Sequence, residues 1–212
     1  MIDYEFEILA ARGGDLVFFG GADASDLVHV ISDIVSNAIC VLTRSKFTHV
    51  AMVLEPTLPV NGKPQTCLNL IESTILAGKS GPQINPAGAR IQGYQGLVFL
   101  ARLSDRTRYM LDWPALWAYM LGLVGTDHYS IKGVADWLAR FVPIVGRLPI
   151  FSQPEKDAVV CSEYIAGGFR AGGFPGLNPH VDCPQTIAEW AIFSCLEQLA
   201  GTPATIRNFN SK

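Results

Sequence analysis

Residues 48–55, THVAMVLE, and residues 67–73, CLNLIES, are two short apolar runs of the kind that forms β-strands. The connection between them, EPTLPVNGKPQT, contains three prolines and an Asn-Gly pair, a composition typical of a loop. Consecutive strands joined by a loop without a helix can pair side by side in opposite directions. The sequence therefore predicts an antiparallel hairpin with a long connection.

Other segments predict further strands and helices around this hairpin. Two more apolar runs, residues 14–20 (GDLVFFG) and 97–103 (LVFLARL), predict strands, and the second follows a Gly/Pro-rich stretch. Apolar residues at helical spacing, with Gly or Pro near several of the ends, predict helices over residues 25–43, 108–124, 131–141, 161–171 and 184–199. The predicted fold class is α+β.

Length and composition indicate one domain with a large core. The chain has 212 residues, of which 49% are hydrophobic. We therefore predict a single domain over residues 1–212, with a helical, aromatic-rich insertion at about residues 108–155. Only 17% of the residues are charged, the net charge is −3, and the 16 Lys and Arg residues are scattered along the chain. This pattern argues against a nucleic-acid partner.

The first residues, MIDYEFEILAARGGD, lack the charged start, apolar stretch and cleavage site of a secretory signal. The longest uncharged apolar run, residues 113–126, is well short of the roughly 20 residues that a membrane span needs. A cytoplasmic protein without a transmembrane segment is therefore predicted. The five cysteines have wide spacings and no CxxC pair, which argues against a disulfide framework or a zinc site. We predict free thiols and no metal or other cofactor.

Cys161 is the candidate nucleophile. It follows the apolar stretch AVV and begins the helical pattern CSEYIAGGFR. A cysteine reacts as the thiolate, and the N-terminus of a helix favours negative charge. The alternative interpretation is a small buried hydrophobic residue, the commoner role of a single free cysteine.

His49 and Glu72 are the candidate base and its orienting carboxylate, because a nucleophilic cysteine needs an imidazole held by an acceptor on its other nitrogen. A hairpin register that places His49 opposite Glu72, and Val53 opposite Leu68, puts these side chains on one face of the sheet. Directly opposed Cβ atoms lie about 4.5–5.5 Å apart, within reach of a hydrogen bond between the side chains. The alternative is that both residues have only a structural role in the sheet. His180 is a second candidate base, but it lies among prolines rather than on a strand.

The order of these segments, GDLVFF, FTHVAMVLE, LIES, DHY and VVCSEYIAGGF, resembles the circularly permuted NlpC/P60 enzymes. These are papain-like proteins that include the YiiX-like and lecithin:retinol acyltransferase-like groups. The resemblance spans roughly residues 12–190. Permuted members place the histidine before the cysteine, as this chain does. The resemblance implies an α+β papain-like fold, in which an antiparallel sheet packs against the helix that bears the cysteine.

The resemblance also implies roles for particular residues. Cys161 would be the nucleophile, His49 the base, Glu72 the group that orients the histidine, and Tyr129 a residue beside the oxyanion site. Tyr129 is equally consistent with a half-buried core tyrosine. Glu163, two residues after the cysteine on the predicted helix, is interpreted as structural.

The implied function is cysteine-dependent hydrolysis of amide or peptide bonds, or of lipid acyl bonds, through a thioester. Alternatives are an acyltransferase or thioesterase acting on lipids, and a catalytically silent binding or assembly module on the same fold. The expected ligand is a small molecule, a peptide or a lipid-like substrate. The aromatic residues after position 113 could line an acyl pocket or merely close the core. The sequence does not indicate an oligomeric state.

Overall fold

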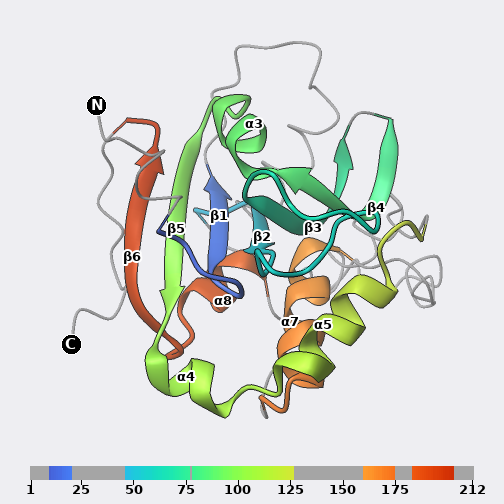
Figure 1. Cartoon of the computed structure of the whole chain (residues 1–212). Coiled ribbons are helices and arrows are strands. Elements are labelled where there is room, and N and C mark those ends of the chain that lie inside the picture. The colour runs from blue at the N-terminus through green and yellow to red at the C-terminus, as the bar shows by residue number, and fades with distance from the viewer. Residues whose placement is uncertain (1–9, 21–45, 77, 127–159, 175–182, 203–212) are drawn as a thin grey trace, which may run out of the picture.

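The computed structural model describes residues 10–20, 46–76, 78–126, 160–174 and 183–202. These residues form an α+β structure with a six-stranded sheet of order β4-β3-β2-β1-β5-β6 (Figure 1), in which every neighbouring pair is antiparallel. The strands are β1 (Leu16–Gly20), β2 (His49–Val53), β3 (Asn69–Leu76), β4 (Lys79–Pro86), β5 (Leu97–Leu103) and β6 (Phe193–Ala200).

Helices cover both faces of the sheet. The described helices are α3 (Ala87–Gln92), α4 (Asp105–Met110), α5 (Trp113–Gly122), α7 (Cys161–Ala171) and α8 (Pro184–Ala188). Helix α7 packs against β2, β3 and α5. Within the described residues, none of the helices has both the length and the apolar character needed to cross a membrane.

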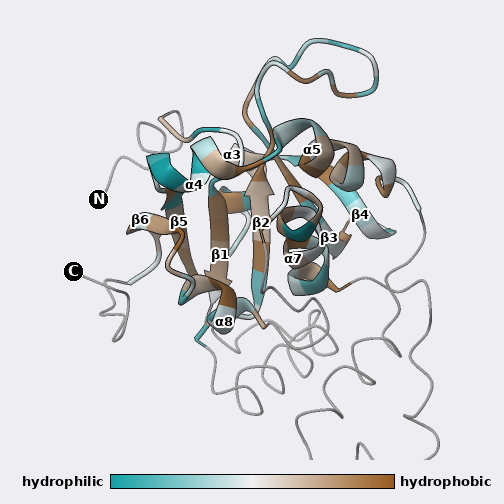
Figure 2. Ribbon diagram, turned by 90° about the horizontal axis from the view of Figure 1, so that it is seen from below, coloured by the Kyte–Doolittle hydropathy of each residue, from teal (hydrophilic) through white to brown (hydrophobic). Residues whose placement is uncertain are grey.

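Strand β1 is fully buried because it contributes side chains to two cores. Leu16 and Phe18 pack in the core shared with α5, α7 and α8, whereas Val17 and Phe19 pack in the core shared with α3. Alternate side chains of a strand point to opposite faces, so a strand covered on both faces is continuously apolar. Figure 2 shows this hydrophobic character along the central strands of the sheet.

Several predicted elements are confirmed. The four predicted strands are β1, β2, β3 and β5, and the helix predicted over residues 161–171 is α7. The helix predicted over residues 108–124 is interrupted between α4 and α5, where the Asp112 side chain accepts a hydrogen bond from the Ala115 N–H and caps α5. The helices predicted over residues 25–43 and 131–141 lie outside the described residues, as does most of the predicted insertion.

Strand β4 and helix α3 occupy the Gly/Pro-rich stretch before β5, where no regular element was predicted. Strand β4 pairs along its whole length with β3 and lies at the edge of the sheet. Proline is tolerated in an edge strand because its missing N–H can face away from the ladder. Pro82 and Pro86 are therefore compatible with β4, and a proline-based argument against a strand fails at this edge.

The helix predicted over residues 184–199 is wrong beyond its first turns. Helix α8 ends at Ala188, and residues 193–200 form β6, which pairs antiparallel with β5. Strand β5 is buried over most of its length, and β6 provides partners for the backbone groups along its second edge. This long-range pairing outweighs the local preference for a helix.

The contact between α7 and α5 depends on glycine in α7. A Cβ atom added to Gly167 would lie 2.6 Å from Cζ of Tyr119, so Gly167→Ala should push the two helices apart. We expect this substitution to lower the free energy of unfolding by about 1–3 kcal/mol, as measured by urea denaturation. Gly88→Ala in α3 is the matched control, because no atom lies within 4 Å of its added Cβ. It should raise the free energy of unfolding by about 0.5–1 kcal/mol, and equal effects of the two changes would contradict the interpretation.

Candidate active site

Cys161 is the first residue of α7. Only 6% of its surface is exposed, and it belongs to the core formed between the helices and the sheet. The preceding Val160 is extended, and its N–H donates to the Glu163 carboxylate at 3.4 Å. Glu163 thus caps the helix start, in agreement with its predicted structural role. The thiol lies where the first N–H groups of a helix lack intrahelical acceptors.

His49 is the first residue of β2 and lies beside β1. It pairs with Phe19 across the two strands, and the two rings are 5.5 Å apart between centroids. Its side chain is 13% exposed, and Nε2 lies 2.5 Å from Oε2 of Glu72. The predicted contact between the histidine and this carboxylate is therefore present.

The register of the hairpin differs from the predicted one. Strand β2 pairs with β3 so that Val53 faces Leu70, whereas the prediction placed Val53 opposite Leu68 and His49 opposite Glu72. The predicted register is wrong by two residues. Because side chains alternate between faces, a shift of two leaves each side chain on its predicted face. His49 and Glu72 therefore approach each other diagonally, over a distance that long side chains can bridge.

Glu72 is fully buried and has three side-chain partners. Oε2 contacts His49, whereas Oε1 accepts hydrogen bonds from Asn85 Nδ2 at 2.9 Å and from Arg90 Nε at 3.0 Å. Burial alone would raise the pKa of Glu72. The hydrogen bond and charge of His49, with the charge of Arg90, outweigh burial and lower the pKa to about 2. Glu72 is therefore a carboxylate throughout the neutral range.

Arg90, in α3, is a site residue that sequence reasoning missed. Its side chain is 13% exposed, and its guanidinium carbon lies 4.5 Å from the centre of the Phe19 ring. An arginine held over an aromatic face in this way is restricted in orientation as well as paired in charge. No signal in the sequence pointed to it, because its partner Glu72 is 18 residues away and α3 was not predicted.

Cys161 and His49 come together at the start of α7. Burial would lower the pKa of His49, but the negative charge of Cys161, its hydrogen bond, and the hydrogen bond and charge of Glu72 raise the pKa to about 9. Since Nε2 contacts Glu72, Nδ1 is the ring nitrogen left for Cys161. The structure thus brings together Cys161, His49 and Glu72, with Asn85 and Arg90 behind the carboxylate. This arrangement can move a proton between a thiol and an imidazole.

No model of a known protein family and no curated protein sequence matches this chain. The site is therefore interpreted from its own geometry.

Two sequence-based candidates lie outside the described residues, namely Tyr129 and the alternative base His180. The four described cysteines, at positions 67, 161, 183 and 195, are free. In the described part of the chain, no group of three or more His, Cys, Asp or Glu side chains is arranged to hold a metal ion.

The shifted pKa values predict how stability depends on pH. The pKa of Glu72 falls from 4.5 to about 2, so its contribution is present above pH 4.5 and is lost as the pH falls toward 2. The pKa of His49 rises from 6.5 to about 9, so its contribution is full below pH 6.5 and is lost as the pH rises toward 9. We expect urea denaturation to give maximal stability between pH 4.5 and 6.5 from these two groups.

The variant His49→Gln is the control for the alkaline limb of this profile. It should remove the decline that His49 causes above pH 6.5, a difference on the order of 2 kcal/mol between the two proteins across the limb. Parallel profiles of the wild type and the variant above pH 6.5 would contradict the raised pKa of His49.

Proposed function

We propose that this protein is a cysteine-dependent hydrolase of amide or peptide bonds, or of lipid acyl bonds, that works through a thioester at Cys161. The observation that carries the proposal is the continuous contact from the Cys161 thiol through the His49 ring to the buried Glu72 carboxylate. A histidine with raised pKa between a thiol and a carboxylate is the arrangement that activates a nucleophilic cysteine. A structural cysteine in a core has no need of it.

The same proposal includes a papain-like fold of the permuted NlpC/P60 type. Its support is the chain order of His49, Glu72 and Cys161, together with an antiparallel sheet that packs against the helix beginning at the cysteine. The shared α+β class is compatible with it, and the activity does not depend on it.

In the proposed reaction, His49 accepts the thiol proton and the Cys161 sulfur attacks the substrate carbonyl. The free N–H groups in the first turn of α7 stabilise the oxyanion. His49 then donates its proton to the leaving group, and a thioester remains on the sulfur. Glu72 holds the ring in one orientation and stabilises its protonated form. Water attacks the thioester with His49 as base and regenerates the thiol.

Acylation by p-nitrophenyl acetate tests the proposal without a known substrate. We expect a burst of nitrophenol and an acetyl group on Cys161, located by peptide mass spectrometry. Cys183 is the internal control, because it also lies at a helix start and is buried, but its sulfur contacts Thr186. Acetylation that survives unchanged in Cys161→Ser would contradict the proposal. A thioester that persists in water but is released by an added amine or alcohol would favour transfer over hydrolysis.

A further inference from the structure

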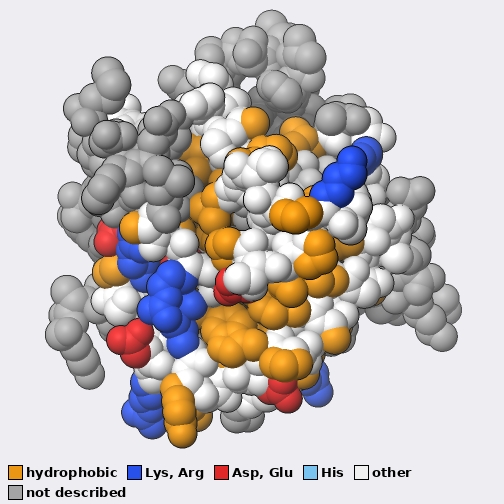
Figure 3. All heavy atoms as spheres, viewed as in Figure 1, with side chains coloured by type: hydrophobic (Ala, Val, Ile, Leu, Met, Phe, Trp, Pro, Cys, Tyr) orange, Lys and Arg blue, Asp and Glu red, His pale blue; other side chains and the backbone are white. Residues whose placement is uncertain are grey.

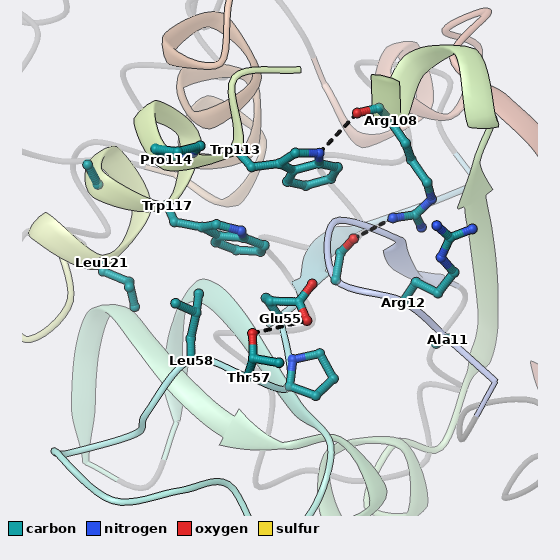
Figure 4. Close-up of a pocket in the computed structure, with 13 residues that line it drawn as sticks. Ala11, Arg12, Glu55, Thr57, Leu58, Arg108, Trp113, Pro114, Trp117 and Leu121 are labelled. Carbon is teal, nitrogen blue, oxygen red and sulfur yellow. Dashed lines mark hydrogen bonds between the residues drawn. The ribbon is translucent and has the colours of Figure 1, made fainter. Parts of the chain in front are cut away.

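A second candidate site lies beside α5, and Cys161 does not contribute to its wall. A pocket of about 810 Å³ opens between α5 and the connection from β2 to β3 (Figure 4). Glu55, Leu58, Trp113, Trp117 and Leu121 contribute to its wall. One side of α5 thus lines this pocket, while Leu116 and Met120 pack in the core.

This pocket is separate from the candidate active site. None of Cys161, His49 and Glu72 contributes to its wall. His49 begins β2, whereas Glu55 follows the end of that strand, a separation of roughly 20 Å along an extended chain. A ligand in the pocket therefore does not contact the proposed nucleophile, and the inference does not rest on the proposed function.

The pocket combines aromatic, aliphatic and charged side chains. Figure 4 shows Trp113 and Trp117 side by side, with Leu58 and Leu121 at one end of the pocket, Arg12 at the other end, and Glu55 between them below the indole rings. The two indole rings are stacked, with centroids 6.0 Å apart and planes inclined by 22°. In the space-filling view, hydrophobic side chains run down the middle of this face and basic side chains gather at their left (Figure 3).

The basic groups at the pocket already have acidic partners. Arg108 forms an ion pair with the buried Asp15 and donates to the Gly13 carbonyl at 2.7 Å. Arg12 lies 3.4 Å from Asp105, which does not line the pocket. Asp15 therefore offsets the charge of Arg108 from outside the cavity, and the guanidinium carbon of Arg108 lies 6.0 Å from the centre of the Trp113 ring. The Arg12–Asp105 pair is exposed to solvent and contributes little.

Glu55 has no such partner. Its side chain accepts one long hydrogen bond, from Thr57 at 3.4 Å, and no cationic side chain among the described residues lies within ion-pair distance. The carboxylate is half-buried, facing the pocket below the indole rings. Glu55 therefore brings to the cavity a carboxylate that no described cationic side chain pairs with.

Glycines hold the acidic and aromatic groups in place. A Cβ atom on Gly13 would lie 2.7 Å from the Glu55 Cα, and one on Gly14 would lie 2.5 Å from Cη2 of Trp113. Gly14 also has a φ of +88°, which a residue with a side chain adopts only with strain. The loop before β1 therefore packs directly against both walls of the pocket and limits their movement.

We propose that this pocket binds an organic ammonium ion that carries an apolar substituent. Indole faces attract cations, and a carboxylate beside them balances the charge. Leu58 and Leu121, at one end of the pocket, accommodate the substituent. A carboxylate ligand fits poorly, because it would face Glu55 and would have to compete with Asp15 and Asp105 for the arginines.

Isothermal titration with benzyltrimethylammonium tests this site, with phenylacetate as the anionic analogue. We expect the cation to bind to the full-length protein at least tenfold more tightly than the anion, and Glu55→Gln to weaken the cation about tenfold. Glu189→Gln makes the same charge change at an exposed position that does not line the pocket, and should leave the affinity within about twofold. Circular dichroism of each variant verifies folding.

Equal binding of the two probes, or an affinity unchanged by Glu55→Gln, would overturn the proposal. Sedimentation with phosphatidylcholine vesicles distinguishes the source of the ammonium group. Vesicle binding that Glu55→Gln removes would identify a lipid headgroup as the ligand, and binding of the soluble cation alone would identify a free ammonium compound. Binding of neither the soluble cation nor the vesicles would exclude the site.

Discussion

Replacement of His49 by Gln is expected to slow the alkylation of Cys161 by iodoacetamide at neutral pH by about tenfold. The thiolate is the reactive form, and an ordinary cysteine is only a few per cent ionised near neutral pH. With a pKa of about 9, His49 is protonated there and places a positive charge and a hydrogen-bond donor beside the Cys161 sulfur. We limit the expected change to about tenfold, because the nucleophilicity of a thiolate falls when a neighbouring charge stabilises it. Peptide mass spectrometry after limited labelling gives the rate at each cysteine.

Cys183 provides the comparison within the same molecule. It precedes α8 as the N-cap residue and is 4% exposed, close to the 6% of Cys161. Its labelling rate should be low in the wild type and unchanged by His49→Gln. Equal rates at the two cysteines in the wild type would mean that a helix start alone determines their reactivity. The Cys161–His49 pair would then have no chemical consequence.

Replacement of Glu72 by Gln should lower the free energy of unfolding by about 3 kcal/mol and also remove the reactivity of Cys161. The substitution leaves the charge of Arg90, whose side chain is 13% exposed, without its buried counter-charge. It also removes the acceptor that favours the protonated ring of His49. Urea denaturation measures the first effect, and iodoacetamide labelling measures the second.

The double variant Glu72→Gln, Arg90→Met separates stability from reactivity. Removing both members of a buried ion pair costs less than removing one, so the second change should recover at least half of the lost free energy. Labelling of Cys161 should stay slow, because His49 still lacks its carboxylate. Additive losses of stability would show that Arg90 does not depend on Glu72. Recovery of labelling would show that the carboxylate does not act on Cys161 through His49.

The sequence predicted the parts of the site that depend on local pattern. Apolar runs located β2 and β3, and the spacing after Cys161 located α7 with its correct bounds. Strand alternation was enough to place His49 and Glu72 on one face of the sheet, although the register was wrong. Because the side chains of a strand alternate with a period of two residues, a register error of two residues does not change the face on which a side chain lies.

The other features of the fold and the site could not be predicted, because they depend on contacts between residues that are distant in sequence. The hairpin forms together with hydrogen bonds inside the long connection between β2 and β3. There, Gln65 Nε2 donates to the carbonyls of Glu55 and Leu58 at 2.7 and 2.8 Å. Arg90 reaches Glu72 only because β4 and α3 fold back over the sheet. Strand β6 forms through its pairing with β5, which no local pattern in residues 193–200 indicates.

The prolines of β4 also affect whether another molecule can add a strand to this edge of the sheet. The Pro82 carbonyl accepts a hydrogen bond from the Gly125 N–H at 3.0 Å, so this position of the edge has no donor and its acceptor is already occupied. A strand from another molecule that approached β4 would find no continuous row of backbone partners at this edge. Proline in an edge strand is one of the means by which proteins avoid edge-to-edge aggregation. The strand that supplies Asn85 to Glu72 is in this way shielded from the strand addition that would otherwise distort it.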